Sequence, residues 1–440
     1  MKKIIQSIFE TEKYQSSIQQ ELIAGITTFL SMAYIVSVHP QIISQTGMPF
    51  SACVTATILI CFFSSAAMGL YANNPIVLGP SVSLSSFFTF TLVKSQGIPW
   101  EIALGATFWV GVIFFILSLF KIREKLALSV PNSIKNALVC GIGLFIAFIG
   151  LKDGGLIIHS DETFLKAKSL TAENGTFLIG LAITFLMLVL RLKGALLLSI
   201  VLVTLLCLPL GHLWGDKILI NYEGVFALPD WTLFAQMDLL NSLQYSFWPV
   251  LFSIAFVDLF ESLGGILGIA KSGPLVSENS IQPRSLKKSL LVDAASTTWA
   301  GLVGSSSALC FLESLTGIRA GGKTGLTAVT AALLFLPFLF LSPLLAMIPH
   351  IATAPVLVVL GSYMMKSATD IEWEKPDEAL PAFVMILLIP LCFSIVQGII
   401  WGFLFYTFLK LVMGKGRKLS LYMYYLSSCC VLFLITDLLL

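Results

Sequence analysis

The feature that most constrains this chain is a succession of long apolar segments with little polar sequence between them. A helix needs about 20 predominantly apolar residues to cross a bilayer, and such segments recur from residue 22 to residue 413. Hydrophobic residues make up 57% of the chain and charged residues 11%, whereas soluble domains carry about 25% charged residues. In lipid, helices satisfy their own backbone polar groups. The sequence therefore predicts an all-α polytopic membrane protein.

Fourteen candidate spans can be counted. They cover residues 22–44, 50–72, 76–93, 101–120, 131–151, 175–190, 194–211, 243–270, 285–303, 305–318, 323–341, 350–366, 379–394 and 395–413. The third and tenth are short and interrupted. A last apolar stretch at 419–440 is interpreted as a terminal interfacial or packing helix, and a fifteenth span there stays open.

Charge placement gives the orientation. If the N-terminus is inside, five of the 26 basic residues fall outside, namely Lys94, Lys152, Lys166, Lys168 and Lys217. This agrees with the positive-inside rule. The first 20 residues are polar and mixed in charge, so the first apolar run is interpreted as a span and not as part of a signal peptide. We expect a multi-pass protein of the cell's inner (plasma) membrane with both termini cytoplasmic.

The chain also has the pattern of an internal repeat. Spans 1–7 and 8–14 are similar in length, and the weak span is the third in each half. Because seven is odd, the second half starts on the opposite side of the membrane. Short, interrupted spans at matching positions of an inverted repeat are typical of the central site of a transporter.

The two interrupted spans predict short extended segments. In residues 74–87, Pro80 removes a backbone donor and blocks the preceding turn, so a half-helix should start near Ser81 to Ser83. In residues 304–314, three serines follow Gly304, and the second half-helix should start near Phe311. The alternative is two helices that are merely kinked by proline and serine.

Four carboxylates lie inside predicted spans: Asp258, Glu261, Asp293 and Glu313. Each costs roughly 2.5–3.5 kcal/mol near the bilayer centre, so such acids are usually functional. Asp258 and Glu261 are three apart and share a helix face, and Glu313 opens the second half-helix. We expect these three to face one crevice. Alternatively, each satisfies free backbone groups, and Asp293 ties its helix to a serine or threonine or serves as a relay.

Acids in such a site suit a polar, uncharged solute. A buried carboxyl group can hold a proton near neutral pH, and it then both donates and accepts hydrogen bonds. This suits a planar ring with alternating donors and acceptors, and it couples movement to protons. No lysine or arginine is expected at comparable depth, and His39 is expected at the membrane interface.

Other classes of function have little support in the sequence. The eight cysteines lie in apolar segments without ligand spacing, so no metal site and no cofactor beyond a coupling proton is expected. The basic residues are scattered over loops, which predicts no nucleic-acid partner. No nucleophile–base pair lies in a span, so the chain is not expected to be an enzyme.

Several motifs carry a resemblance to a known family. They are Gly25-Ile-Thr-Thr-Phe-Leu-Ser-Met-Ala-Tyr-Ile, Pro131-Asn-Ser-Ile-Lys-Asn-Ala, the glycine-rich run at 141–151, Asp258-Leu-Phe-Glu-Ser-Leu-Gly, Glu313-Ser, Ala320-Gly-Gly-Lys-Thr-Gly-Leu-Thr-Ala, Ile351-Ala-Thr-Ala-Pro and Asp370-Ile-Glu-Trp. With these motifs, residues 20 to 415 resemble the AzgA-type purine permeases. These are hypoxanthine/guanine/adenine:proton symporters of the nucleobase–ascorbate transporter superfamily.

The resemblance implies a seven-plus-seven inverted repeat with a core and a gate domain, usually assembled as a homodimer. It implies that a purine base binds between the two half-helices and span 8, and that the family's essential acids match Asp258, Glu261 and Glu313. The expected divisions are a cytoplasmic segment 1–20, core halves 21–120 and 243–341, gate halves 121–242 and 342–418, and a C-terminal hydrophobic segment 419–440.

The chain departs from the family pattern around the expected pocket. The family's Pro-Gly-Met-Gly-Leu-Asn is Pro80-Ser-Val-Ser-Leu-Ser here, so Ser85 replaces a binding asparagine. Its Thr-Thr-Tyr-Ile-Glu is Leu-Cys-Phe-Leu-Glu, ending at Glu313. We expect Ser83, Ser85, Phe311 and Leu312 to line the pocket. The prediction is proton-coupled uptake of purine bases with altered selectivity; the alternative is a different small polar or anionic solute on the same fold.

Overall fold

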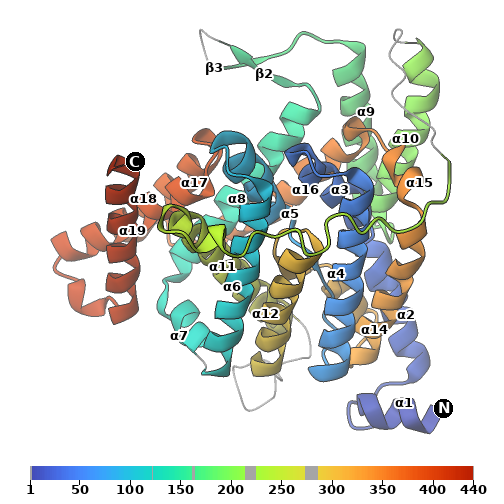
Figure 1. The fold of residues 1–440 in the computed structure, drawn as a ribbon, viewed down its shortest axis with the longest axis horizontal. Helices are drawn as coiled ribbons and strands as arrows, with labels where there is room; N and C mark the ends of the chain where they lie inside the picture. Colours follow the sequence, from blue (N-terminus) through green and yellow to red (C-terminus); the bar gives the residue numbers. More distant parts are fainter. Residues whose placement is uncertain (1, 121, 161–163, 214–223, 273–285, 440) are drawn as a thin grey trace.

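The computed structural model describes residues 2–120, 122–160, 164–213, 224–272 and 286–439, and its regular structure is almost entirely helical (Figure 1). The longer helices are α2 (Ile18–Met32), α3 (Ile35–Ile43), α4 (Phe50–Tyr71), α6 (Trp100–Leu119), α8 (Asn132–Asp153), α9 (Ala172–Val189), α10 (Ala195–Leu213), α11 (Trp248–Ser272), α12 (Leu286–Val303), α14 (Gly325–Phe335), α16 (His350–Met365), α17 (Pro376–Leu391), α18 (Ile395–Val412) and α19 (Leu421–Leu439). Shorter helices are α1 (Lys2–Phe9), α5 (Val82–Ser86), the π-helix η2 (Phe87–Ser95), α7 (Ile122–Ser129), α13 (Ser314–Arg319) and α15 (Ser342–Ala346).

Seven stretches of the described chain are long and apolar enough to cross a membrane. They are Ile18–Thr46, Phe50–Tyr71, Trp100–Leu119, Asn132–Asp153, Tyr245–Ile266, His350–Asp370 and Ile395–Val412. Their outer faces expose large apolar side chains such as Phe63, Ile116 and Phe408. Exposed apolar surface of this kind marks a membrane-facing or partner-facing region. The chain is a multi-pass membrane protein.

The predicted segments coincide with the observed elements. Thirteen of the fourteen lie on helices or on a strand followed by a helix, with bounds within a few residues of the prediction, while the first is divided between α2 and α3. In the first turn of α3, Val36 and Ser37 donate to carbonyls three residues back instead of four. Helix α7 is an element that the apolar pattern did not predict, because it is short and carries several charges.

One group of helices packs around α4. Helix α12 lies against α6 and α4, and α14 lies against α4 and α2. The contact between α14 and α4 is so close that a Cβ on Gly325 would lie 1.9 Å from the carbonyl oxygen of Gly69. Glycine at both positions therefore allows the two backbones to touch.

A second group packs around α8. Helices α16 and α17 lie on α8, α18 lies on α17, and α9 and α10 cover α16. Helix α19 packs on α18 and so belongs to this group. Figure 1 shows α17, α18 and α19 together at one end of the molecule.

The helix pairs recur between the two halves of the chain. Helices α6 and α12 are the fourth and ninth segments, and they pack together. Their counterparts in the other half of the chain are the eleventh segment, α14, and the second, α4, which also pack together. In the same way, α8 with α17 corresponds to α16 with α9, and α9 with α10 corresponds to α17 with α18. The pairs therefore recur in the order that an internal repeat predicts.

The two interrupted segments meet as short antiparallel strands, which confirms their predicted extended backbone. Strand β1 (Leu78–Pro80) pairs with β4 (Ala308–Cys310), with Gly79 opposite Leu309. The crossing is extended by hydrogen bonds from Ser81 N to Ser307 O at 3.1 Å and from Phe311 N to Val77 O at 3.0 Å. All six strand residues are buried. A second antiparallel pair, β2 (Ile157–Ser160) with β3 (Phe164–Ala167), projects at one end of the molecule (Figure 1).

Candidate functional site

A short helix follows each of the crossed strands. Ser81 caps α5, since its Oγ accepts a hydrogen bond from the Leu84 N–H at 3.2 Å, and α5 starts at Val82 as predicted. Helix α13 starts at Ser314, three residues after the predicted Phe311. The delay has a local cause, because a turn in which Ser314 N donates to Phe311 O at 3.1 Å precedes the helix.

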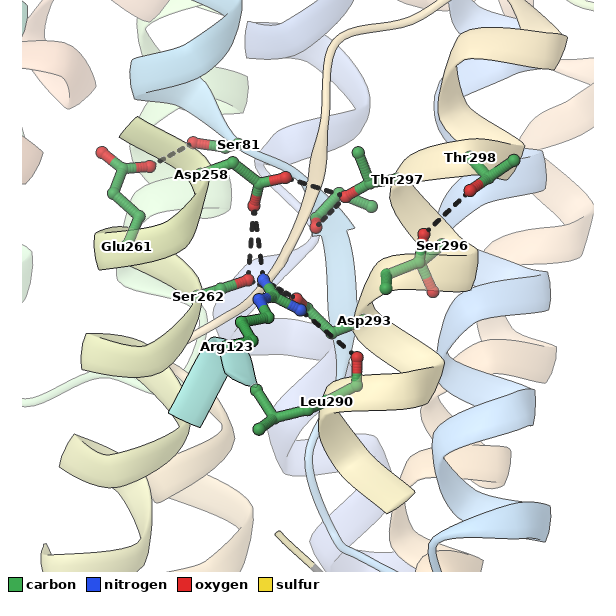
Figure 2. A network of polar contacts seen from close by, with 12 residues as sticks. Ser81, Arg123, Asp258, Glu261, Ser262, Leu290, Asp293, Ser296, Thr297 and Thr298 are labelled. Carbon is green, nitrogen blue, oxygen red and sulfur yellow. Dashed lines mark hydrogen bonds and ion pairs between the residues drawn. The ribbon is translucent and has the colours of Figure 1, made fainter. Parts of the chain in front are cut away.

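Glu261 of α11 lies at the start of α5. Its Oε2 accepts hydrogen bonds from Ser83 Oγ at 2.7 Å and Ser81 Oγ at 3.1 Å, and Figure 2 shows it reaching Ser81. Its Oε1 is buried and has no hydrogen-bond partner among the described residues. A buried carboxyl oxygen without a partner is costly in a protein interior, so this oxygen is available to a ligand.

Glu313 lies at the start of α13. Its Oε1 accepts a hydrogen bond from the hydroxyl of Tyr34 at 2.7 Å. The Tyr34 ring lies 6.5 Å from the ring of Phe311, which is buried. Leu312, by contrast, is 54% exposed. Of the two predicted pocket residues, Phe311 is thus buried and Leu312 is exposed. Tyr34, which the sequence analysis did not single out, contacts Glu313.

Ser83 and Ser85 are held differently. Ser83 bonds Glu261, as described above, whereas Ser85 has no exposed surface. The Ser85 hydroxyl donates to the carbonyl of Ser81 at 2.5 Å and lies 2.7 Å from Ser306 Oγ. Ser85 therefore ties α5 to the residues before β4.

Asp258 and Asp293 form a separate, fully buried cluster with Arg123 (Figure 2). Arg123 Nη2 lies 2.7 Å from Asp293 Oδ2 and 3.9 Å from Asp258 Oδ1. Ser262 of α11 donates to Asp293 of α12, which is a contact of the kind that the structural alternative for Asp293 describes. Asp258 lies 3.3 Å from Thr297 Oγ1 and 3.3 Å from Ser262 Oγ. The acids of α11 thus face two environments, and the single shared crevice expected for Asp258, Glu261 and Glu313 is not what their contacts describe.

Two expectations about charged and titratable groups were wrong. No lysine or arginine was expected at the depth of the acids, but α7 packs on α6 and α11 and the side chain of Arg123 is completely buried beside Asp293. His39 was expected at the interface, but it is fully buried. Its Nδ1 lies 2.6 Å from Thr57 Oγ1 and its Nε2 lies 3.1 Å from Ser305 Oγ.

The family of the chain follows from its sequence as a whole. The model of the family described as Permease family (Xan_ur_permease) matches residues 19–401, which include both crossed strands and all four acids. The chain belongs to this permease family.

Named relatives match this permease over nearly its full length. It is 37% identical over 422 residues to "Adenine permease AdeP" of Escherichia coli strain K12, covering 95% of this chain and 93% of the relative. It is also 37% identical over 422 residues to "Guanine/hypoxanthine permease PbuO" of Bacillus subtilis strain 168, covering 94% and 96%.

Solved structures share the fold. The transmembrane domain of a cyanobacterial bicarbonate transporter, BicA, matches with a TM-score of 0.63 at 16% identity, covering 87% of this permease and 97% of that domain. At this identity the likeness concerns the fold alone.

Sequence reasoning missed three buried polar residues that lie near the crossed strands or beside the four acids: Arg123, His39 and Tyr34. Arg123 lies in a charged stretch whose local pattern is that of a loop. His39 and Tyr34 lie in the first predicted span, where a histidine and the Tyr in the Ser-Met-Ala-Tyr motif were available as signals. Ser305, which contacts His39, and Glu313, which contacts Tyr34, lie far away in the sequence, so the local pattern could not identify these contacts.

Proposed function

We propose that this permease takes up purine nucleobases together with protons by alternating access. The observation that carries the proposal is the placement of one carboxyl group at the start of each half-helix. Glu261 is held by two serines at α5, and Glu313 is held by Tyr34 at α13. The names of the relatives, adenine and guanine/hypoxanthine permeases, support the choice of substrate.

The chemistry of the two acids favours a base over an anion. A purine edge alternates N–H donors with ring nitrogen or carbonyl acceptors, and a carboxyl group accepts when ionised and donates when protonated. An anion would favour free helix N-termini, but at these two N-termini a carboxylate is already present. A carrier of a different polar or anionic solute remains the alternative, and the test below includes it.

We further propose the architecture that goes with this function: fourteen spans in two inverted repeats, divided into a core and a gate. The helix contacts that recur between the halves support the repeat, and the two groups around α4 and α8 support the division. When the core moves against the gate, the crossed strands would move with the core and carry Glu261 and Glu313 with them. A homodimer in the inner membrane with cytoplasmic termini completes the proposal.

Uptake of radiolabelled hypoxanthine tests the function. A purine-transport-deficient bacterium expressing the chain should accumulate it, and a protonophore should abolish the accumulation. Unlabelled guanine, adenine, xanthine, uracil and sulfate serve as competitors, and cells with the empty vector as control. Uptake blocked by purines supports the proposal. If the protein reaches the membrane and only sulfate or another anion enters, the alternative solute class holds instead.

A further inference from the structure

The buried cluster of Arg123, Asp258 and Asp293 has one positive and up to two negative charges. All three side chains have no exposed surface. An arginine keeps its charge throughout the physiological pH range. With both acids ionised the cluster carries a net charge of about −1 in a low-dielectric interior, which is costly. One added proton makes the cluster neutral.

The distances assign the two acids different states. Arg123 Nη2 is 2.7 Å from Asp293 Oδ2, and Nη1 donates to the carbonyl of Leu290 on the same helix at 3.3 Å. Asp258 Oδ1 is 3.9 Å from Nη2, beyond hydrogen-bond distance. The guanidinium therefore holds Asp293 as a carboxylate and leaves Asp258 as the acid that takes the proton.

The hydroxyl groups around Asp258 each have one proton to donate. The Ser262 hydroxyl donates to Asp293, so its 3.3 Å contact with Asp258 becomes a hydrogen bond when Asp258 is protonated and donates. Thr297 Oγ1 lies 3.3 Å from Asp258 Oδ2 and 3.4 Å from the carbonyl of Ala308. It can donate to one of them at a time.

The acceptor to which Thr297 donates links Asp258 to the crossed strands. When Asp258 is ionised, Thr297 donates to it; when Asp258 is protonated, Thr297 is free to donate to Ala308 in β4. Strand β4 pairs with β1, which leads to Ser81 and Ser83 at Glu261. The proton on Asp258 thus changes a hydrogen bond of the crossed strands themselves.

The groups that face Asp258 are few in the described part of the chain. Arg123 comes from α7, Asp293 from α12 and Cys310 from β4, and Glu261 lies one turn away on α11. The Arg123 guanidinium is also stacked 4.5 Å from the ring centre of Phe114 on α6, which fixes its plane.

We propose that Arg123 is a positioning residue of the transport cycle: it keeps Asp293 ionised and so makes Asp258 the acid that binds and releases the coupled proton. The proposal rests on the proposed function. A proton from water binds Asp258 on the loading side and leaves to water on the other side, so the cluster alternates between net neutral and one negative charge.

The transport test compares pH profiles of uptake in proteoliposomes. Without the guanidinium, a carboxylate in the cluster is less stable. Asp258 in the Arg123→Gln variant should therefore keep its proton to higher pH, and the pH profile of uptake should shift in the alkaline direction. Arg123→Lys, which keeps the charge, should stay near the wild-type profile. Arg123→Gln with Asp293→Asn removes one charge of each sign and should return the profile toward wild type. If Arg123 were merely structural, Arg123→Gln would lower the amount of folded protein but leave the profile unchanged, and that result would overturn the proposal.

An infrared measurement tests Asp258 without any substrate. Difference spectra of the purified protein during a pH titration should contain a carbonyl stretch of a protonated acid that is missing in Asp258→Asn and retained in the Arg123→Gln, Asp293→Asn double variant. Identical spectra for wild type and Asp258→Asn would overturn the proposal. If no nucleobase is transported, the proposed function fails, while the infrared result still decides the role of Asp258.

Discussion

At the scale of single residues, the four membrane acids divide by their partners. Glu261 and Glu313 accept hydrogen bonds from hydroxyl groups and lie partly exposed at the two half-helices. Asp258 and Asp293 are fully buried around Arg123. The same chemical group thus accepts hydrogen bonds from hydroxyl groups in one pair and lies beside an arginine in the other. Partners, and not residue type, set what each carboxyl group does.

Replacing Glu261 with Gln should abolish most nucleobase binding while the protein stays folded. The amide retains a carbonyl oxygen for Ser83 but loses the charge, and a hydrogen bond to a charged group contributes about 1.5–3 kcal/mol. Affinity for hypoxanthine should fall by about 10- to 150-fold. Binding by the purified protein in detergent, with the melting temperature recorded alongside, checks this.

Glu372→Gln is the matched control, because Glu372 is exposed and pairs with Lys375 away from the site. It should bind like wild type. If Glu261→Gln binds hypoxanthine with wild-type affinity, Glu261 does not take part in binding the base.

At the scale of elements, the crossing of β1 and β4 depends on one small residue at its centre, Gly79. A Cβ on Gly79 would lie 3.1 Å from the Phe311 ring, 3.1 Å from Cys61 Sγ and 3.2 Å from the Met32 methyl. These contacts are tighter than ordinary packing. The strands can therefore cross within the helix bundle because Gly79 leaves room for its neighbours.

Gly79→Val should destabilise the protein by about 1–3 kcal/mol, because the added atoms overpack a filled core. It should also reduce uptake, since Phe311 lies beside the Glu313 site. Thermal unfolding in detergent and uptake measure the two effects. Gly175→Val on α9 is the control, because nothing lies within 4 Å of a Cβ there. Equal stability of the two variants would show that the crossing tolerates bulk.

At the scale of the whole molecule, the two helix groups touch at the middle of η2. Thr91 Oγ1 donates to the carbonyl of Phe393, in the turn between α17 and α18, at 3.0 Å. Phe393 also packs on Phe90 and Phe145 through edge-to-face ring contacts. A movement of one group against the other has to open or slide this contact.

Linking the two groups should therefore stop transport. Cysteines placed by Thr91→Cys and Phe393→Cys, with the exposed Cys392 changed to Ser, should form a cross-link on oxidation, since the hydrogen bond keeps both backbones close. Uptake should be lost on oxidation and restored by reduction, and each single cysteine should remain active. Full uptake by a protein whose cross-link is demonstrated would contradict a relative movement at this contact.

The sequence by itself determined the membrane class, the positions of the apolar segments and the extended backbone at Pro80. These features follow from local chemistry, because transfer into lipid and the missing proline donor depend on residues close together in the chain. Tertiary structure decided the partners. Arg123 meets Asp293 across 170 residues, and Tyr34 meets Glu313 across 279. Packing alone brings such groups together, so no periodicity could show that Arg123 is buried or that Ser85 is tied to Ser306.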